Sequence, residues 1–291
     1  MPTPQPRKLD KRLITRRAVL GGMAVGFTGA FSYARFVEPT WLEIRELTIP
    51  VRGLAPSFDG YKVGLVSDIH WPINLSEERM RGLGEEFARR EVDVLCIPGD
   101  LMDGHDLANL PSFRDVFEGW EAKDGIYATL GNHDHAIGRA HVVREVNRHT
   151  PLELIDNSRV LIERGSDALV IAGVGDLWED TVDAQAALGR LPDEIPRILL
   201  SHNPDVAEEL VGDYRVDLQL SGHTHGGMLG IGNWYPGTPS RYGNKFREGL
   251  CQGAHHQVFV SKGISPMRRH LRFGARPDIA IITLRAAQDS V

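Results

Sequence analysis

Five short segments of the sequence carry side chains that bind metal ions, and glycines flank three of them. A single His-x-His pair, such as His223 and His225 in SGHTHGG, is weak evidence, because surface loops also carry histidines. Together, however, the segments offer carboxylate, carboxamide and imidazole groups, and this mixture suits transition metals better than calcium. The five segments are Asp68-x-His70, Gly99-Asp100, Gly131-Asn132-His133-Asp134, the single His202, and Gly222-His223-x-His225.

Each segment directly follows a short apolar run of strand length. Several of these runs are apolar throughout, as is typical of strands that are buried on both faces. Where strands and helices alternate, ligands bind beyond the carboxyl ends of the strands. We therefore expect the five segments to meet at one edge of the sheets. The strands are predicted at residues 61–67, 92–98, 125–130, 168–174, 197–201, 216–220, 256–261 and 278–284.

Polar, helix-like stretches separate the predicted strands, and this alternation indicates an α/β fold. One helix is predicted over residues 76–90, where Ser76 is a suitable cap and apolar residues recur at helical spacing. A second helix is predicted over residues 203–211. Residues 228–249 are rich in glycine and proline and predict a long loop. No linker divides the chain, so residues 46–291 are predicted to form a single domain.

The order of the five segments resembles that of the calcineurin-like metallophosphoesterases. This resemblance implies a four-layer αββα sandwich with two mixed β-sheets. The stretches FDGYKVGLVSDIH, GHTHGG, VFVSKGIS and RPDIAIITL further resemble an exported or membrane-associated bacterial phosphodiesterase branch of that family. Some members of that branch hydrolyse the pyrophosphate of UDP-diacylglucosamine.

The resemblance also implies a site for two divalent metal ions, with manganese, iron and zinc as the candidates. Asp100 is the implied bridging carboxylate, because one aspartate can offer an oxygen to each ion and offset part of their charge. The first ion would be held by Asp68, His70, Asp100 and His225. The second would be held by Asp100, Asn132, His202 and His223.

The implied chemistry is hydrolysis of a phosphodiester or a pyrophosphate by a hydroxide that bridges the two ions. His133 is the predicted proton donor to the leaving group, with Asp134 orienting its ring and Asp100 completing the catalytic group. The nearby Asp103, His105 and His135 are predicted to be surface or supporting residues. Two alternatives remain: a metal-binding scaffold without activity, and a phosphomonoesterase. The substrate is expected to be a phosphoester, with a lipid or a UDP-linked lipid as candidates.

The amino-terminal segment, residues 1–45, is predicted to be a twin-arginine-type signal peptide or membrane anchor with a short linker. Arg16 and Arg17 precede an uncharged run over residues 18–33. The expected location is extracytoplasmic, either periplasmic or membrane-anchored, with the twin-arginine translocation machinery and a membrane surface as partners. Ser32-Tyr33-Ala34 is a candidate cleavage site. The whole chain has a net charge of -6 although this segment is basic, so the remainder is acidic and no nucleic-acid partner is expected.

Four arginines cluster near the carboxyl end, in the stretch MRRHLRFGAR. This stretch is predicted to be a solvated basic turn, with a contact to phosphate or anionic lipid as the alternative. The arginines are Arg268, Arg269, Arg272 and Arg276.

Overall fold

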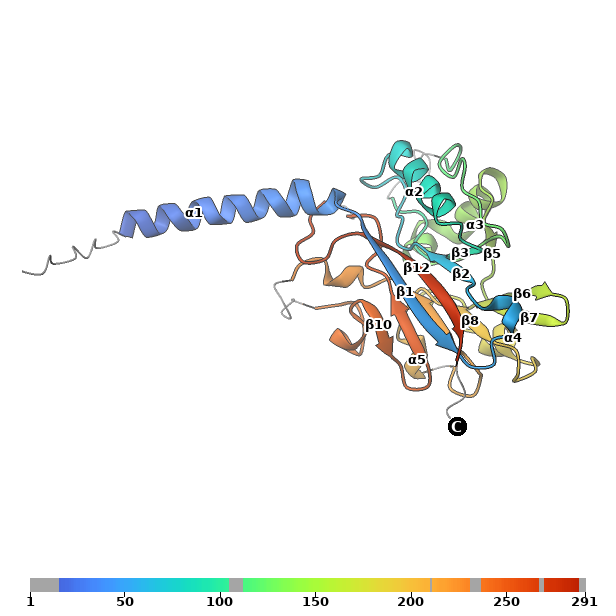
Figure 1. Cartoon of the computed structure of the whole chain (residues 1–291). Coiled ribbons are helices and arrows are strands. Elements are labelled where there is room, and N and C mark those ends of the chain that lie inside the picture. The colour runs from blue at the N-terminus through green and yellow to red at the C-terminus, as the bar shows by residue number, and fades with distance from the viewer. Residues whose placement is uncertain (1–15, 105–111, 210, 231–236, 267–269, 288–291) are drawn as a thin grey trace, which may run out of the picture.

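The computed structural model describes residues 16–104, 112–209, 211–230, 237–266 and 270–287. Its first sheet contains six strands in the spatial order β1-β12-β2-β3-β4-β5 (Figure 1). β1 runs parallel to β12, β12 antiparallel to β2, and β2 to β5 parallel to one another, so the sheet is mixed. The strands are β1 Glu43–Val51, β2 Lys62–Leu65, β3 Val94–Pro98, β4 Ile126–Thr129, β5 Glu153–Leu154 and β12 Asp278–Ala286.

The second sheet also has six strands, in the order β10-β11-β9-β8-β7-β6. Its four central strands are parallel, and the two edge strands run antiparallel to their neighbours. The strands are β6 Ser158–Arg164, β7 Asp167–Gly173, β8 Arg197–Leu200, β9 Leu218–Ser221, β10 Gly249–Gln252 and β11 Gln257–Val260.

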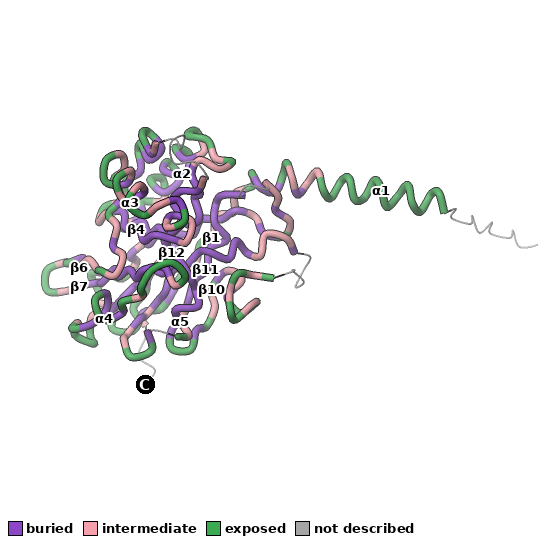
Figure 2. Tube along the Cα trace, turned by 180° about the vertical axis from the view of Figure 1, so that it is seen from behind, coloured by how far each residue is buried: buried purple, intermediate pink, exposed green. Residues whose placement is uncertain are grey.

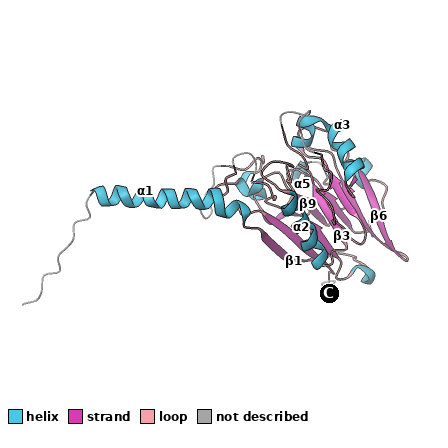
Figure 3. Cartoon of the chain, turned by 90° about the horizontal axis from the view of Figure 1, so that it is seen from above, coloured by secondary structure: helices cyan, strands magenta, loops and turns pink. Residues whose placement is uncertain are grey.

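The two sheets face each other across a shared apolar core. Val63 of β2 and Val94 of β3 lie in the same buried cluster as Ile171 of β7 and Leu220 of β9. Separate clusters hold α2 and α3 on the outer face of the first sheet, and α4 and α5 on that of the second. The predicted αββα sandwich is therefore confirmed, and Figure 3 shows the layers from above. These helices are α2 Glu77–Arg89, α3 Asn132–His149, α4 Ala184–Leu188 and α5 Val206–Glu209.

The helix predicted after Ser76 forms for the expected reason. The Ser76 hydroxyl accepts a hydrogen bond from the Arg79 amide, which satisfies one of the free amides at the start of α2. Met80, Leu83 and Phe87 are buried against the first sheet. The second predicted helix is short: α5 covers Val206–Glu209 only.

Other elements were not predicted. α3 begins at Asn132, inside one of the ligand segments, and β1, β6 and β10 add strands to the edges of both sheets. β1 begins at Glu43, so three residues that were assigned to the amino-terminal linker belong to the first sheet.

The amino-terminal helix α1, Arg16–Ser32, projects away from the sandwich (Figure 1). None of its residues is buried, and Figure 2 shows it exposed along its length. Within the described residues, no helix has both the length and the apolar character needed to cross a membrane. Residues 1–15, with most of the basic amino-terminal residues, lie outside the described part of the chain.

Candidate metal centre

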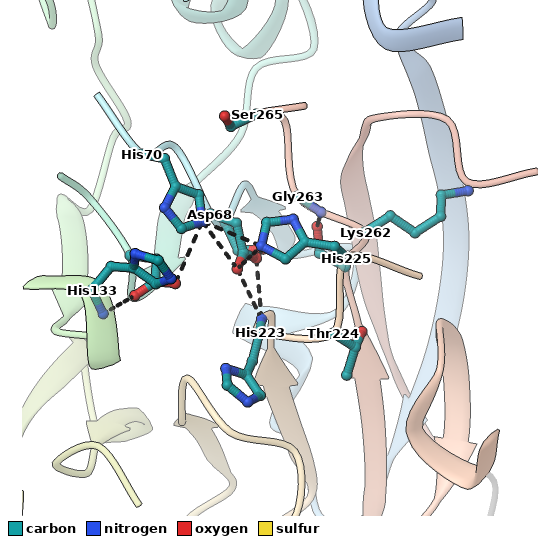
Figure 4. A network of polar contacts seen from close by, with 12 residues as sticks. Asp68, His70, His133, His223, Thr224, His225, Lys262, Gly263 and Ser265 are labelled. Atoms are coloured by element: carbon teal, nitrogen blue, oxygen red, sulfur yellow. Dashed lines mark hydrogen bonds and ion pairs between the residues drawn. The ribbon is translucent and has the colours of Figure 1, made fainter. Parts of the chain in front are cut away.

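The first predicted ligand group converges on one point at the carboxyl ends of β2 and β3. One ligand atom from each of Asp68, His70, Asp100 and His225 lies within 4.8 Å of the others. The Nε2 atoms of His70 and His225 are 3.2 Å apart, and each faces a carboxylate: His70 Nε2 is 3.4 Å from Asp100 Oδ2, and His225 Nε2 is 3.4 Å from Asp68 Oδ1. Figure 4 shows the rings of His70 and His225 turned toward the Asp68 carboxylate.

The second predicted group converges on His202, which follows β8. Its Nε2 lies 3.3 Å from Asp100 Oδ2, 3.2 Å from Asn132 Oδ1 and 3.1 Å from His223 Nδ1. Asp100 Oδ2 is thus shared by the two groups, since it faces both His70 and His202. This is the connectivity that the family resemblance implies for a bridging carboxylate.

The backbone at these segments is strained. Asp68, His70, Asp100, His223 and His225 all have left-handed φ angles, between 50° and 68°. This conformation costs a residue other than glycine roughly 1–2 kcal/mol. Residues held in such conformations cluster at functional sites, where the surrounding structure compensates for the strain. The concentration of strain at the candidate ligands is therefore evidence for a site, independent of the side-chain chemistry.

His202 is oriented for metal binding by a hydrogen bond to the backbone. Its Nδ1 lies 3.0 Å from the carbonyl oxygen of Pro98, which fixes the proton on Nδ1 and leaves the Nε2 lone pair facing the site. The close approach depends on Gly99, which has a φ of 82°: a Cβ atom there would lie 2.6 Å from His202 Nδ1. A glycine is thus required at position 99 both by the left-handed φ angle and by the close packing of the His202 ring.

The electrostatics of the buried site favour a positive charge. Burial alone would raise the pKa of Asp100, but the imidazoles of His202 and His70 hold it well below its usual range. Burial opposes the charged form of His202 too, yet Asp100 raises the pKa of this histidine to about 10. Burial lowers the pKa of His70 to about 4 and that of His223 to about 3. Positive charge is therefore favoured beside Asp100, and the neutral forms of His70 and His223 are those that metal ligands require.

The residues present fit divalent metal ions. Two pairs of buried imidazole nitrogens approach to 3.1–3.2 Å, so each pair either shares a proton in a hydrogen bond or directs two lone pairs at the same point, which is the arrangement that a metal ion binds. The donor set combines imidazoles, carboxylates and one carboxamide, which suits manganese, iron or zinc.

His133 lies beside the first group, although Asp134 does not orient it as predicted. The Asp134 carboxylate instead accepts hydrogen bonds from the amides of Leu101, Met102 and Gly131, and so ties the start of α3 to the Asp100 loop. Asp103 takes the predicted role, because its Oδ2 lies 3.3 Å from His133 Nδ1.

Asp103 is buried, so of the two predicted roles, surface or supporting, the structure gives it the supporting one. The same Oδ2 lies 3.6 Å from His70 Nδ1, so one carboxylate faces both rings. Burial lowers the pKa of His133, but the bond to Asp103 outweighs it and raises the pKa overall. His135 faces Asp180 at 3.9 Å, and His105 lies outside the described residues.

Two further residues at the site were missed. The indole of Trp178 is 48% exposed and stands edge-on to the His223 ring, with 4.2 Å between ring centroids. Arg272 was predicted to be solvated but is completely buried. Its guanidinium donates to the carbonyl oxygens of Lys262, Gly263, Ser265 and Ala275. Arg268 and Arg269 lie outside the described residues.

Arg272 thereby stabilises the loop that covers Asp68. The Ser265 amide donates to the Asp68 carbonyl, and the Ile264 amide donates to the carbonyl of Ser67. Gly263 packs directly on the aspartate: a Cβ atom there would lie 2.5 Å from Asp68 Cβ. No sequence signal marks this role, since it depends on contacts between distant segments.

Several known proteins are similar to this chain. A family model described as calcineurin-like phosphoesterase matches residues 61–227. The uncharacterized metallophosphoesterase YkuE of Bacillus subtilis is 30% identical over 96% of this chain and 99% of its own. Phosphodiesterase YaeI of Escherichia coli is 26% identical over 94% of this chain and 100% of its own. The UDP-2,3-diacylglucosamine pyrophosphatase LpxG of Chlamydia trachomatis is 22% identical over 86% of this chain and 91% of its own.

Proposed function

The chain belongs to the calcineurin-like phosphoesterase family, and we propose that it is a hydrolase of phosphodiesters or pyrophosphates that uses two divalent metal ions. The observation that carries the proposal is the shared position of Asp100. Its Oδ2 lies 3.4 Å from His70 Nε2 in one ligand group and 3.3 Å from His202 Nε2 in the other. Two ions held on either side of this carboxylate would supply a hydroxide nucleophile at neutral pH and offset charge on the phosphoryl oxygens.

His133 is the proposed proton donor to the leaving group. Its Nδ1 faces Asp103, which leaves Nε2 to carry the proton that the departing oxygen takes. The side chain is 27% exposed, so a substrate can reach it, whereas Asp103 is buried. The carboxylate raises the pKa of His133 and so favours the protonated ring that this role requires.

The phosphodiesterase and pyrophosphatase names of two relatives favour a substrate with groups on both sides of the phosphorus. Trp178 supports this choice, because an exposed indole beside His223 offers an apolar surface to such a group. A phosphomonoesterase is the second candidate. A scaffold without activity is disfavoured, since His133 and all seven candidate ligands are present and their side chains converge.

The amino-terminal segment supports export as a further part of the proposal. Arg16 and Arg17 followed by an uncharged stretch are typical of substrates of the twin-arginine translocation machinery. The enzyme would then act outside the cytoplasm or at a membrane.

The test is hydrolysis by protein loaded with manganese, iron or zinc. Bis(nitrophenyl) phosphate, nitrophenyl phosphate and a UDP-linked lipid would be compared. We expect cleavage of the diester or of the UDP-linked lipid to exceed that of the monoester. Asp100→Ala should lose at least one ion and all turnover, because the Asp100 carboxylate faces both His70 and His202. Asp193→Ala is the matched control, since its side chain is 93% exposed. Normal turnover and metal content in Asp100→Ala would refute the two-metal proposal.

A further inference from the structure

We infer that the amino-terminal helix stays attached to the folded protein and seats the metal-site edge of the sandwich on an anionic lipid bilayer, so that the substrate is a phosphoester of a membrane lipid. The substrate part of this inference rests on the proposed hydrolase function. The seating part rests on the structure of residues 16–41 and on the topology of the first sheet.

The candidate cleavage site is part of the fold. Ala34 is 5% exposed, and its carbonyl accepts a hydrogen bond from the Arg272 amide. The Tyr33 ring packs edge-on against Phe273, with 5.9 Å between centroids. Four residues on, Glu38 is 2% exposed and its Oε1 accepts from the Ala275 amide. Proteases cut exposed, flexible segments, so cleavage after Ala34 would require this part of the fold to open.

The sheet topology places the helix at the metal-site edge. β1 begins at Glu43, which pairs with Asp278 at the beginning of β12. β12 runs antiparallel to β2, so the beginnings of β1 and β12 lie at the carboxyl end of β2, where Asp68 follows. The chain therefore enters the sandwich at the edge that carries the candidate ligands. Figure 1 shows α1 joining the body near the beginning of β1.

Arg272 connects the base of the helix, residues 33–41, to the metal site. Its backbone amide bonds to Ala34, while its guanidinium bonds to the carbonyls of Gly263 and Ser265 in the loop over Asp68. The buried guanidinium makes this connection short and rigid, so the orientation of the base fixes the orientation of the site.

The exposed residues of this region have the chemistry of a lipid-contacting segment. Residues 18–34 contain no charged side chain, and the large exposed apolar residues of α1 lie mostly on one face, opposite small residues such as Gly22 and Gly29, so the helix turns no charged face to water. The apolar side chains of such a helix have a lower free energy in contact with lipid than in water. The exposed apolar residues of α1 are Val19, Leu20, Met23, Val25, Phe27 and Phe31.

Arginines and aromatic rings mark the ends of this apolar segment. Arg16 and Arg17 begin it, and Arg35 follows it. At the base, Trp41 is 51% exposed, and the Arg276 guanidinium lies 4.2 Å from its ring centroid. Tryptophan and arginine beside an apolar helix are typical of the membrane–water interface, and the arginines favour anionic headgroups.

The test uses the purified full chain and vesicles of phosphatidylcholine with phosphatidylglycerol. The variant carries Leu20→Glu and Phe27→Glu, two positions that are 65% and 74% exposed and therefore not needed for folding. The control carries Leu161→Glu and Leu250→Glu, on the exposed faces of β6 and β10. Binding is measured by flotation, and hydrolysis with hexadecyl nitrophenyl phosphate in the vesicles and with soluble bis(nitrophenyl) phosphate.

We expect the α1 variant to lose vesicle binding by about 100-fold or more, because each buried carboxylate is strongly disfavoured in lipid. Hydrolysis of the vesicle substrate should fall with it, while hydrolysis of the soluble diester and all properties of the control remain unchanged. Unaltered vesicle binding and vesicle hydrolysis in the α1 variant would overturn the inference. Self-association of the full chain through α1 without flotation would also overturn it, in favour of a second copy as the partner.

Failure of the proposed function has a different signature: the metal-loaded protein would not cleave the soluble diester, whatever the flotation result.

Helix retention is tested separately, by the mass of the protein isolated from membranes of the producing cells. A chain that includes residues 16–34 supports retention, and a chain that begins at Arg35 contradicts it.

Discussion

Replacing Arg272 by methionine should destabilise the protein strongly. The substitution keeps an unbranched chain of similar length but removes the donors for four carbonyl oxygens, at distances of 2.5–3.0 Å. Burial lowers the pKa of Arg272 to about 10, so the guanidinium is charged at neutral pH. Hydrogen bonds from charged donors contribute about 1.5–3 kcal/mol each, but the cost of burying the charge offsets much of their sum.

We therefore expect a loss of about 3–5 kcal/mol in the free energy of unfolding, because four buried carbonyl oxygens lose their donor at about 1–3 kcal/mol each, while the cost of burying the charge disappears. Domains are stable by only about 5–15 kcal/mol, so the change is large. With a urea m-value of about 3 kcal/mol/M, the midpoint should fall by roughly 1–1.7 M. The measurement is urea denaturation of the metal-free protein, followed by circular dichroism.

Two further variants make the result specific. Arg241→Met, whose side chain is 67% exposed, should change stability by at most about 1 kcal/mol. Arg272→Lys, which keeps the charge with fewer donors, should fall between the two and lower metal affinity by about 10–100-fold, because the loop over Asp68 loosens. If Arg272→Met cost no more than Arg241→Met, the carbonyl contacts would not hold this loop, and our account of Arg272 would be wrong.

Four other outcomes follow from the site. His133→Ala should retain metal and lower kcat by about 10²–10⁴-fold, less for nitrophenolate leaving groups; an equal defect for all leaving groups would argue against proton donation. Asp103→Asn should move the alkaline limb of the kcat–pH profile to lower pH. The Asp103 carboxylate raises the pKa of His133, so without it the ring loses its proton at lower pH. An unmoved limb would contradict the pairing of Asp103 with His133. Gly99→Ala should displace His202 and reduce metal content, since the new Cβ would lie 2.6 Å from Nδ1; metal analysis decides. Removing metal with a chelator should lower the free energy of unfolding by about 2.7 kcal/mol relative to protein with free metal at a hundredfold excess over Kd; equal thermal melting with and without metal would mean that no ion binds the folded state.

The candidate ligands could be predicted from sequence because each is local to a strand end. Asp68 and Asp100 directly follow apolar runs that can only be buried strands, and the carboxyl ends of parallel strands meet at one edge. The family resemblance then supplied the fold class, which the two mixed sheets and their outer helices confirm.

What the sequence did not reveal depends on contacts between distant segments. Asp103 has no periodicity that marks it, and only the fold turns its carboxylate toward His70 and His133. Arg272 lies in a basic stretch that predicts exposure, yet carbonyls from two loops replace its hydration. α3 was hidden because it begins within a ligand segment, and because Gly138, with a φ of 116°, interrupts its helical pattern.

The position of β12 in the first sheet has a consequence for biosynthesis. β12 lies between β1 and β2, so strands from opposite ends of the sequence are neighbours. While the ribosome is still translating the segments in between, β1 has no partner and β2 has an open edge, which is the condition in which nascent chains aggregate. The sheet can close only after residue 286 has been synthesised. Closure of the first sheet is therefore a late step of folding, and a chaperone that protects the nascent chain before this step would bind it while the apolar amino-terminal segment is already exposed.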